Sequence, residues 1–247
     1  MSLLAVRGLS KWFGGLPALN NISFEVAEGE ILGIIGANGA GKTTLFSLIA
    51  GNERASAGDI RFRGRSISRL RPDQRCRAGV ARTFQIVRPF SALSVLDNVM
   101  VPVFFGARAE HNHDAARARA LEILGEVGLR GRHDKLAGAL TLSDQKRLEI
   151  ARALGSEPKL IMLDEVVAGL TATEIDELLE SIRAIKERRS LTILFVEHVM
   201  QAVMRLSGRV IVLHHGEIIA EGDPHSISQD PRVIEVYLGA EVDRTAS

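Results

Sequence analysis

"EILGIIGANGAGKTTLFSLIAG" (30–51) is the stretch that decides the fold. It begins with a nearly continuous apolar run, typical of a buried strand, and ends with an apolar-periodic segment, typical of a helix. Between the two, Gly36 to Thr43 satisfy G-x-x-x-x-G-K-[ST]. Glycines at such a turn let consecutive N–H groups point inward around a phosphate chain, and the following helix N-terminus adds partial positive charge. The stretch therefore predicts a phosphate-binding loop.

The side chains of this loop suit ATP and Mg²⁺. Lys42 supplies a full charge for the β- and γ-phosphates, and the Thr43 hydroxyl can ligate Mg²⁺. A glycine-rich turn with a surface lysine is the alternative, and the flanking strand and helix argue against it. The residues expected to hold the nucleotide are Gly36, Asn38, Gly39, Ala40, Gly41, Lys42, Thr43 and Thr44.

Strand-like and helical segments alternate outward from this loop, which predicts an α/β fold with a mostly parallel sheet and right-handed crossovers. A half-exposed strand is expected at 22–27, buried strands at 159–165, 191–198 and 209–214, and an amphipathic helix at 171–189. Thr171 or Thr173 can cap that helix, and basic residues occupy its last turn.

The middle of the chain breaks the alternation. "SVLDNVMVPVFF" (94–105) and "HDAARARALEILGEVGL" (113–129) both have helical patterns. We therefore expect a helical lobe over about 88–151, inserted into a core made of about 1–87 and 152–247.

Composition describes a globular chain in a reducing compartment. Of 247 residues, 46% are hydrophobic and 25% charged, which excludes a disordered chain. The net charge of +1 gives no electrostatic argument for nucleic acid as a partner. The single cysteine, Cys76, excludes an intrachain disulfide. Since a long apolar span and a signal-peptide pattern are lacking, we expect a cytosolic protein that reaches a membrane through partners.

A phosphate-binding loop predicts a second strand that ends in carboxylates, and "LIMLDEV" (160–166) supplies it. Asp164 can hold Mg²⁺ at the end of the strand, directly or through water. Glu165 can polarise an attacking water as general base. Two solvated acidic residues at a strand end would be the usual interpretation without the loop.

Gln85 in "ARTFQ" and His198 in "LFVEH" are further candidates at strand ends. Gln85 could reach the metal or the water, and His198 could contact the γ-phosphate. A lone glutamine or histidine is as often structural, so these roles depend on the loop and the carboxylates.

The motifs together resemble those of ABC-transporter ATP-binding subunits over nearly the whole chain. The phosphate loop, Gln85, a signature segment near 140–144, "LDE" (163–165) and His198 occur in that family's order and spacing. Longer stretches resemble the subunits of branched-chain amino-acid importers and their urea and amide relatives. These stretches include "FGGLPALNNISFEV" (13–26), "ARTFQIVRPFSALSVLDNV" (81–99) and "VEHVMQAVMRLSGRVIVLHHGEIIAEGDP" (196–224).

The resemblance implies one ATPase domain over 1–247, with an antiparallel β subdomain beside the parallel sheet. It implies a dimer in which each ATP lies between one subunit's phosphate loop and the other's signature. It implies that an aromatic residue stacks on adenine, which by position is Phe13 rather than Trp12. It also implies permease subunits in the membrane, a solute-binding protein acting indirectly, and a peripheral position at the cytoplasmic face.

"LTLSD" (140–144) stands where that family usually shows LSGGQ or LAYGQ. There a helix N-terminus, a hydroxyl and free N–H groups meet the other subunit's γ-phosphate. The signature residues are then Thr141, Leu142, Ser143 and Asp144.

Asp144 either folds back as a local cap or brings negative charge towards that phosphate and weakens the half-site. We favour repulsion, because Thr141 or Ser143 can already cap the helix. A weak half-site favours a heterodimer.

Other departures concern coupling. Val166-Val167 replace the usual Pro-Thr after Glu165, and Thr171 replaces an aspartate that is common in the family. Residues 86–105 are expected to receive a coupling helix from the permease, although plain core packing explains many of them. A lipid or lipopolysaccharide exporter subunit and a weakly hydrolysing regulatory subunit are the alternatives.

Overall fold

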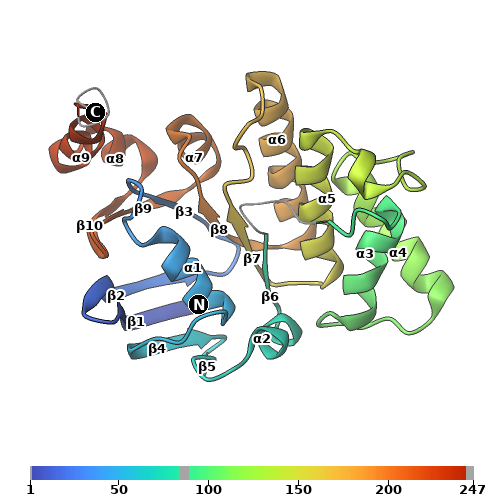
Figure 1. Cartoon of the computed structure of the whole chain (residues 1–247), viewed down its shortest axis with the longest axis horizontal. Coiled ribbons are helices and arrows are strands. Elements are labelled where there is room, and N and C mark those ends of the chain that lie inside the picture. The colour runs from blue at the N-terminus through green and yellow to red at the C-terminus, as the bar shows by residue number, and fades with distance from the viewer. Residues whose placement is uncertain (1, 84–88, 243–247) are drawn as a thin grey trace. The chain divides into compact units, whose positions relative to one another are not determined.

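The computed structural model describes residues 2–83 and 89–242, with side chains up to residue 236 (Figure 1). The chain divides into two compact units. Unit 1 comprises Met1–Pro72 and Leu194–Ser247, and unit 2 comprises Asp73–Ile193. Within the described ranges, no helix is both long and apolar enough to cross a membrane.

Unit 1 begins with an antiparallel sheet whose strand order is β2-β1-β4-β5. β1 and β2 pair along most of their lengths through several register shifts, which bend the ribbon. These strands are β1 (Ser2–Phe13), β2 (Leu16–Ala27), β4 (Ala57–Phe62) and β5 (Arg65–Ser66). The sheet is the antiparallel subdomain that the family resemblance implies.

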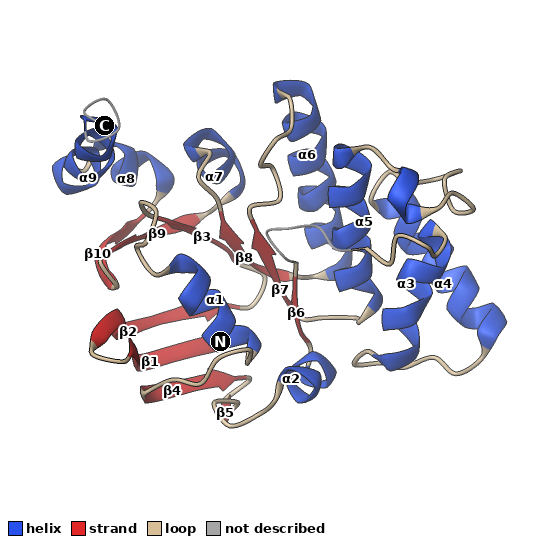
Figure 2. Ribbon diagram, viewed as in Figure 1, coloured by secondary structure: helices blue, strands red, loops and turns tan. Residues whose placement is uncertain are grey.

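The remaining elements of unit 1 include the strand and the helix on either side of the phosphate loop. β3 (Ile31–Ile35) pairs in parallel with β9 (Arg209–His214), and β10 (Glu217–Gly222) pairs antiparallel with β9. Every residue of β3 is buried, as its continuous apolar run predicts. Figure 2 shows α1 (Lys42–Ala50) between these strands and the antiparallel sheet. The C-terminal helices of the unit are α7 (Met200–Leu206), α8 (Pro224–Gln229) and α9 (Pro231–Val242).

Unit 2 contains a parallel strand pair and a group of helices. β6 (Val80–Arg82) pairs in parallel with β7 (Leu160–Asp164), and β8 (Thr192–Val196) crosses the boundary between the units. α3 packs against α4 and α5, as Figure 1 also shows. The helices of unit 2 are α2 (Pro72–Ala78), α3 (Val95–Phe105), α4 (His113–Glu126), α5 (Leu142–Gly155) and α6 (Ala172–Arg189), with a short 3-10 turn, η1 (Ala137–Ala139).

The predicted elements occur close to their expected positions. Parallel pairs in both units confirm the α/β class, and Thr171 caps α6 in a full capping box with Glu174. The predicted strand at 191–198 is wrong at its end, because β8 stops at Val196. The lobe proposed for 88–151 lies within unit 2, and its boundaries stay a prediction.

Candidate nucleotide-binding and catalytic site

The phosphate loop is shaped by close packing at its two outer glycines. A Cβ on Gly36 would lie 2.2 Å from the Leu213 carbonyl oxygen, and one on Gly41 would lie 2.7 Å from the Ala18 carbonyl oxygen. Gly41 also has a φ of 103°, which favours glycine. Gly39 has a φ of 81°, but the space beside its Cα is open. The outer glycines therefore fix the loop within its own unit, whereas the centre of the loop stays open to a ligand.

Lys42 bends back over the loop that precedes it. Its ammonium donates to the carbonyl oxygens of Gly36, at 2.6 Å, and Ala37, at 2.9 Å. No side chain caps the start of α1, and its first turn carries no acidic residue. A helix start without a side-chain cap and with a nearby ammonium can bind phosphate oxygens.

The other predicted nucleotide ligands lie around the same turn. Ala40 is buried and its carbonyl accepts from the Gly216 N–H, which ties the loop to the β9–β10 turn. Asn38 and Thr43 are exposed, and Thr44 is half-buried. Exposure of Asn38 and Thr43 leaves their polar atoms accessible to a ligand.

Phe13 ends β1 and is about half exposed, as is Trp12 beside it. The Lys11 ammonium lies 4.6 Å from the centre of the Phe13 ring, in a cation–π contact. The exposed ring of Phe13 can therefore stack on a flat base, as predicted.

Asp164 ends β7 and is 1% exposed. One carboxylate oxygen accepts from the Arg82 guanidinium at 2.7 Å, and its N–H donates to the Thr83 hydroxyl at 3.0 Å. Burial raises the pKa of the Asp164 carboxyl, and the hydrogen bond and charge of Arg82 oppose that rise. Asp164 is therefore held in one position by Arg82, which lies in β6, and by Thr83, which directly follows β6.

Glu165 follows Asp164 with a φ of 50°, in the left-handed region that residues other than glycine rarely occupy. Its carbonyl oxygen accepts from the Lys146 ammonium at 2.8 Å, which connects this turn to α5. Strained backbone of this kind persists where the surroundings hold it, and it is common at active sites.

His198 is exposed and lies two residues beyond β8, in a bend before α7. The position allows contact with a ligand, although it differs from the strand end that the sequence predicts. Gln85 lies outside the described residues, so its predicted contacts with metal and water stay a prediction.

The signature turn forms a capped helix start. Thr141 is the N-cap of α5, and its hydroxyl accepts from the Asp144 N–H at 3.3 Å. Within the described part of the chain, the N–H groups of Leu142 and Ser143 have no acceptor. These two groups remain available to an anion.

The preference for repulsion by Asp144 does not take account of a partner for its carboxylate within the chain. The Asp144 side chain is buried and forms an ion pair with Arg132, which lies in the segment before α5. The ion pair compensates the charge that was expected to face a phosphate. The structure therefore favours a local role for Asp144 over a free carboxylate that faces a phosphate.

Sequence reasoning missed the three basic residues that hold this site in place. Arg82 pairs with Asp164, Lys146 binds the Glu165 carbonyl, and Arg132 pairs with Asp144. Each partner lies 12 or more residues away, so no local spacing indicates the contact. Only the contact of Arg82 had a signal in the sequence, because Arg82 stands directly before the segment that contains the candidate ligand Gln85.

The donor types present fit Mg²⁺. Thr43 in unit 1 and Asp164 in unit 2 each offer an oxygen atom of the kind that Mg²⁺ prefers, and this ion usually takes one or two protein ligands with waters and phosphates. Among the described residues, no group of three or more His, Cys, Asp or Glu side chains could hold a metal. A site completed by a nucleotide's phosphates requires no such group.

Two family descriptions match the chain. Residues 19–168 match the ABC transporter family, and residues 217–243 match a segment described as branched-chain amino acid ATP-binding cassette transporter. The first match contains both the phosphate loop and the Asp164–Glu165 pair.

Individual relatives are similar over nearly their full lengths. The high-affinity branched-chain amino acid transport ATP-binding protein LivG of Salmonella typhimurium is 41% identical, covering 96% of this chain and 98% of that protein. The crystal structure of an ABC-transporter cassette in its ADP conformation has a TM-score of 0.88 at 30% identity, covering 97% and 99% of the two chains. A dimeric bacterial ABC transporter cassette has a TM-score of 0.81 at 25% identity, covering 90% and 98%.

Proposed function

The chain belongs to the ABC transporter family as an ATP-hydrolysing subunit, and we propose that it powers an importer of branched-chain amino acids. The phosphate loop carries this proposal. Its outer glycines leave no room for a Cβ, and Lys42 lies across it at the start of an uncapped helix. The solute class is supported by the match at 217–243 and by the name of the LivG relative.

We assign the chemical steps to residues of both units. Lys42 and the N–H groups at the start of α1 bind the β- and γ-phosphates, and Phe13 stacks on adenine. Thr43, Asp164 and Gln85 would hold Mg²⁺, which would offset phosphate charge when bound. Glu165 takes a proton from the attacking water, and His198 contacts the γ-phosphate.

The partners follow from the family. We propose a second cassette subunit, two membrane permease subunits and, indirectly, a solute-binding protein, with this chain at the cytoplasmic face of the inner membrane. A dimeric relative supports the second cassette. We favour a heterodimer, because Ser143 adds a side chain where the family has glycine, and a different chain can supply the usual signature to this chain's ATP.

The Glu165→Gln variant tests the catalytic assignment. Replacing the carboxylate by an amide removes the base but keeps the shape, so MgATP binding should persist while turnover falls about 100-fold or more. ATPase activity is measured in the complex reconstituted with its permeases and second cassette, with the exposed Glu180→Gln on α6 as control. Turnover near wild type in Glu165→Gln would reject the assignment.

The solute requires a separate measurement. Vesicles that contain the complex and its binding protein should accumulate labelled leucine with ATP, and the Glu165→Gln complex should not. Active ATP hydrolysis without uptake of leucine, isoleucine or valine would support the ATPase function and reject the assignment of branched-chain amino acids as the solute.

A further inference from the structure

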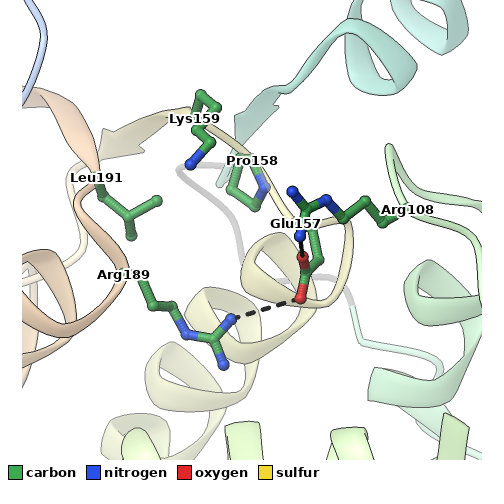
Figure 3. A pocket seen from close by; sticks show the side chains of 6 residues that line it. All are labelled: Arg108, Glu157, Pro158, Lys159, Arg189 and Leu191. Carbon is green, nitrogen blue, oxygen red and sulfur yellow. Dashed lines mark ion pairs between the residues drawn. The ribbon is translucent and has the colours of Figure 1, made fainter. Parts of the chain in front are cut away.

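A cavity of about 210 Å³ lies in unit 2, and none of the residues that line it is assigned to the nucleotide (Figure 3). Three chain segments form it: the loop after α3, the turn between α5 and β7, and the end of α6 with the residues that follow. Its lining residues are Arg108, Glu157, Pro158, Lys159, Arg189 and Leu191.

The charged lining is mainly basic. Arg108, Lys159 and Arg189 contribute three positive charges and Glu157 one negative charge, which leaves a formal charge of +2. Beyond the lining, Arg119 is paired with Glu157, and Glu126 is paired with both Arg189 and Arg188, so these neighbours do not remove the excess positive charge. A cavity with two excess positive charges is suited to an anion with two negative charges.

Glu157 also orders the basic residues around it. Its carboxylate is ion-paired with Arg119 and lies 3.9 Å from both Arg108 and Arg189, as Figure 3 shows for the last two. Glu126 holds the other side of Arg189 through a hydrogen bond of 2.6 Å. Glu157 also adopts a φ of 53°, a strained conformation that surrounding contacts must maintain. Arg189 is therefore positioned before any ligand arrives.

The other two basic side chains are available for binding. Arg108 has a side chain that is 78% exposed, and its contact with Glu157 is long. For the Lys159 ammonium, the described residues provide no hydrogen bond or ion pair. Figure 3 shows the Lys159 side chain extending beside Pro158 and Leu191, the apolar part of the lining.

We propose that this cavity is a binding site for a phosphate group. The charge of +2 matches a phosphate near pH 7, and guanidinium and ammonium groups are the usual donors to phosphate oxygens. The basic residues approach from three chain segments, which suits a tetrahedral anion with oxygens in several directions better than a planar carboxylate. The phosphate group belongs either to free inorganic phosphate or to a phospholipid headgroup.

Calorimetric titration with inorganic phosphate tests the first source. The full chain is used in a Lys42→Ala background, which lowers phosphate binding at the loop. Adding Arg108→Ala and Lys159→Ala should weaken the remaining binding about 10-fold or more, because two charge-assisted contacts are lost. Arg108→Ala alone removes a mostly exposed side chain, so it should fold normally and weaken binding several-fold.

A matched control separates a site from general charge. Arg117→Ala with Lys135→Ala removes the same two charges from exposed positions of unit 2 and should leave phosphate binding unchanged. Equal weakening in the control and cavity variants would overturn the proposal, since it would reduce the effect to net charge.

Vesicle co-sedimentation tests the second source. Vesicles of phosphatidylcholine with phosphatidic acid should retain the protein if a lipid headgroup is bound, and the cavity variant should lose this retention while the control keeps it. A loss in either assay that is confined to the cavity variant supports the phosphate site and identifies its source. If the cavity variant matches the parent protein in both assays, the proposal is wrong.

Discussion

The start of α1 and the start of α5 both present a helix N-terminus to a phosphate in the proposed mechanism, yet the chain completes them differently. α1 begins after Gly41 with no side-chain cap and no acidic residue in its first turn. α5 begins at a Thr141 cap, and its first-turn Asp144 is paired with Arg132. The start of α1 is therefore not capped by a side chain, whereas the start of α5 is partly satisfied by its own chain.

The difference also appears in the glycines. Around α1, close approaches to the carbonyl oxygens of Leu213 and Ala18 require glycine whether or not nucleotide is bound. In the proposed dimer, Ser143 and Asp144 of the signature would face another subunit's nucleotide. The phosphate loop is therefore constrained by its own unit, whereas we expect the signature to be constrained by the assembled complex.

Gly36→Ala should have the largest effect. Its Cβ would lie 2.2 Å from the Leu213 carbonyl oxygen, and backbone must move to relieve that contact. We expect a loss of about 3 kcal/mol or more in the free energy of unfolding, measured by urea denaturation of the isolated chain. The matched Gly39→Ala change enters open space at a φ of 81° and should cost about 1 kcal/mol. Equal losses would show that packing does not fix the loop.

Lys42→Ala should have the second largest effect, which is a loss of affinity for MgATP. Loss of the ammonium removes charge-assisted contacts with phosphate and should weaken MgATP binding by about 2–4 kcal/mol, measured by calorimetry. Phe13→Ala should cost about 1–3 kcal/mol by analogy with base–aromatic stacking. The exposed Phe105→Ala in unit 2 is the control and should change nothing. If Phe13→Ala weakens binding more than Lys42→Ala, phosphate contacts do not dominate the site.

Arg132→Ala tests the α5 side of the comparison. It leaves the Asp144 carboxylate buried without its ion-pair partner, which should cost about 1–2 kcal/mol in unfolding, because Arg132 itself is partly exposed. Adding Asp144→Asn should recover most of the loss, which a double-mutant cycle measures. Exposed Arg130→Ala serves as control. Additive losses in the double variant would mean that the pair contributes little to stability.

The sequence predicted the elements that local pattern controls. Strand β7 ends at Asp164, and α6 begins after the Thr171 cap, because apolar runs and capping residues are read from adjacent positions. The ion pairs of Arg82 and Arg132 could not be predicted in this way, since they depend on which segments the fold brings together. The left-handed conformation of Glu165 was missed because no glycine or asparagine marked it.

The smallest effects should come from the signature itself, and they separate its two unusual residues. Ser143→Gly removes a side chain where the family has glycine and should raise hydrolysis at the second cassette's site about threefold, which corresponds to well under 1 kcal/mol of barrier. Asp144→Gln should change the same rate less than about twofold, since Arg132 already compensates the carboxylate. Each rate is measured in the assembled complex with this chain's own site silenced by Glu165→Gln.

The two variants then decide what the departure from glycine means. Turnover at this chain's own ATP site, measured with the second cassette's site silenced instead, should not respond to either change, because in the proposed dimer the other subunit's signature completes that site. If Asp144→Gln raises the second site's turnover more than Ser143→Gly does, the carboxylate still repels phosphate despite its ion pair. In that case the ion pair with Arg132 would not determine how the signature acts. The electrostatic effect of Asp144 would then depend on the assembled complex, as the effect of Ser143 does.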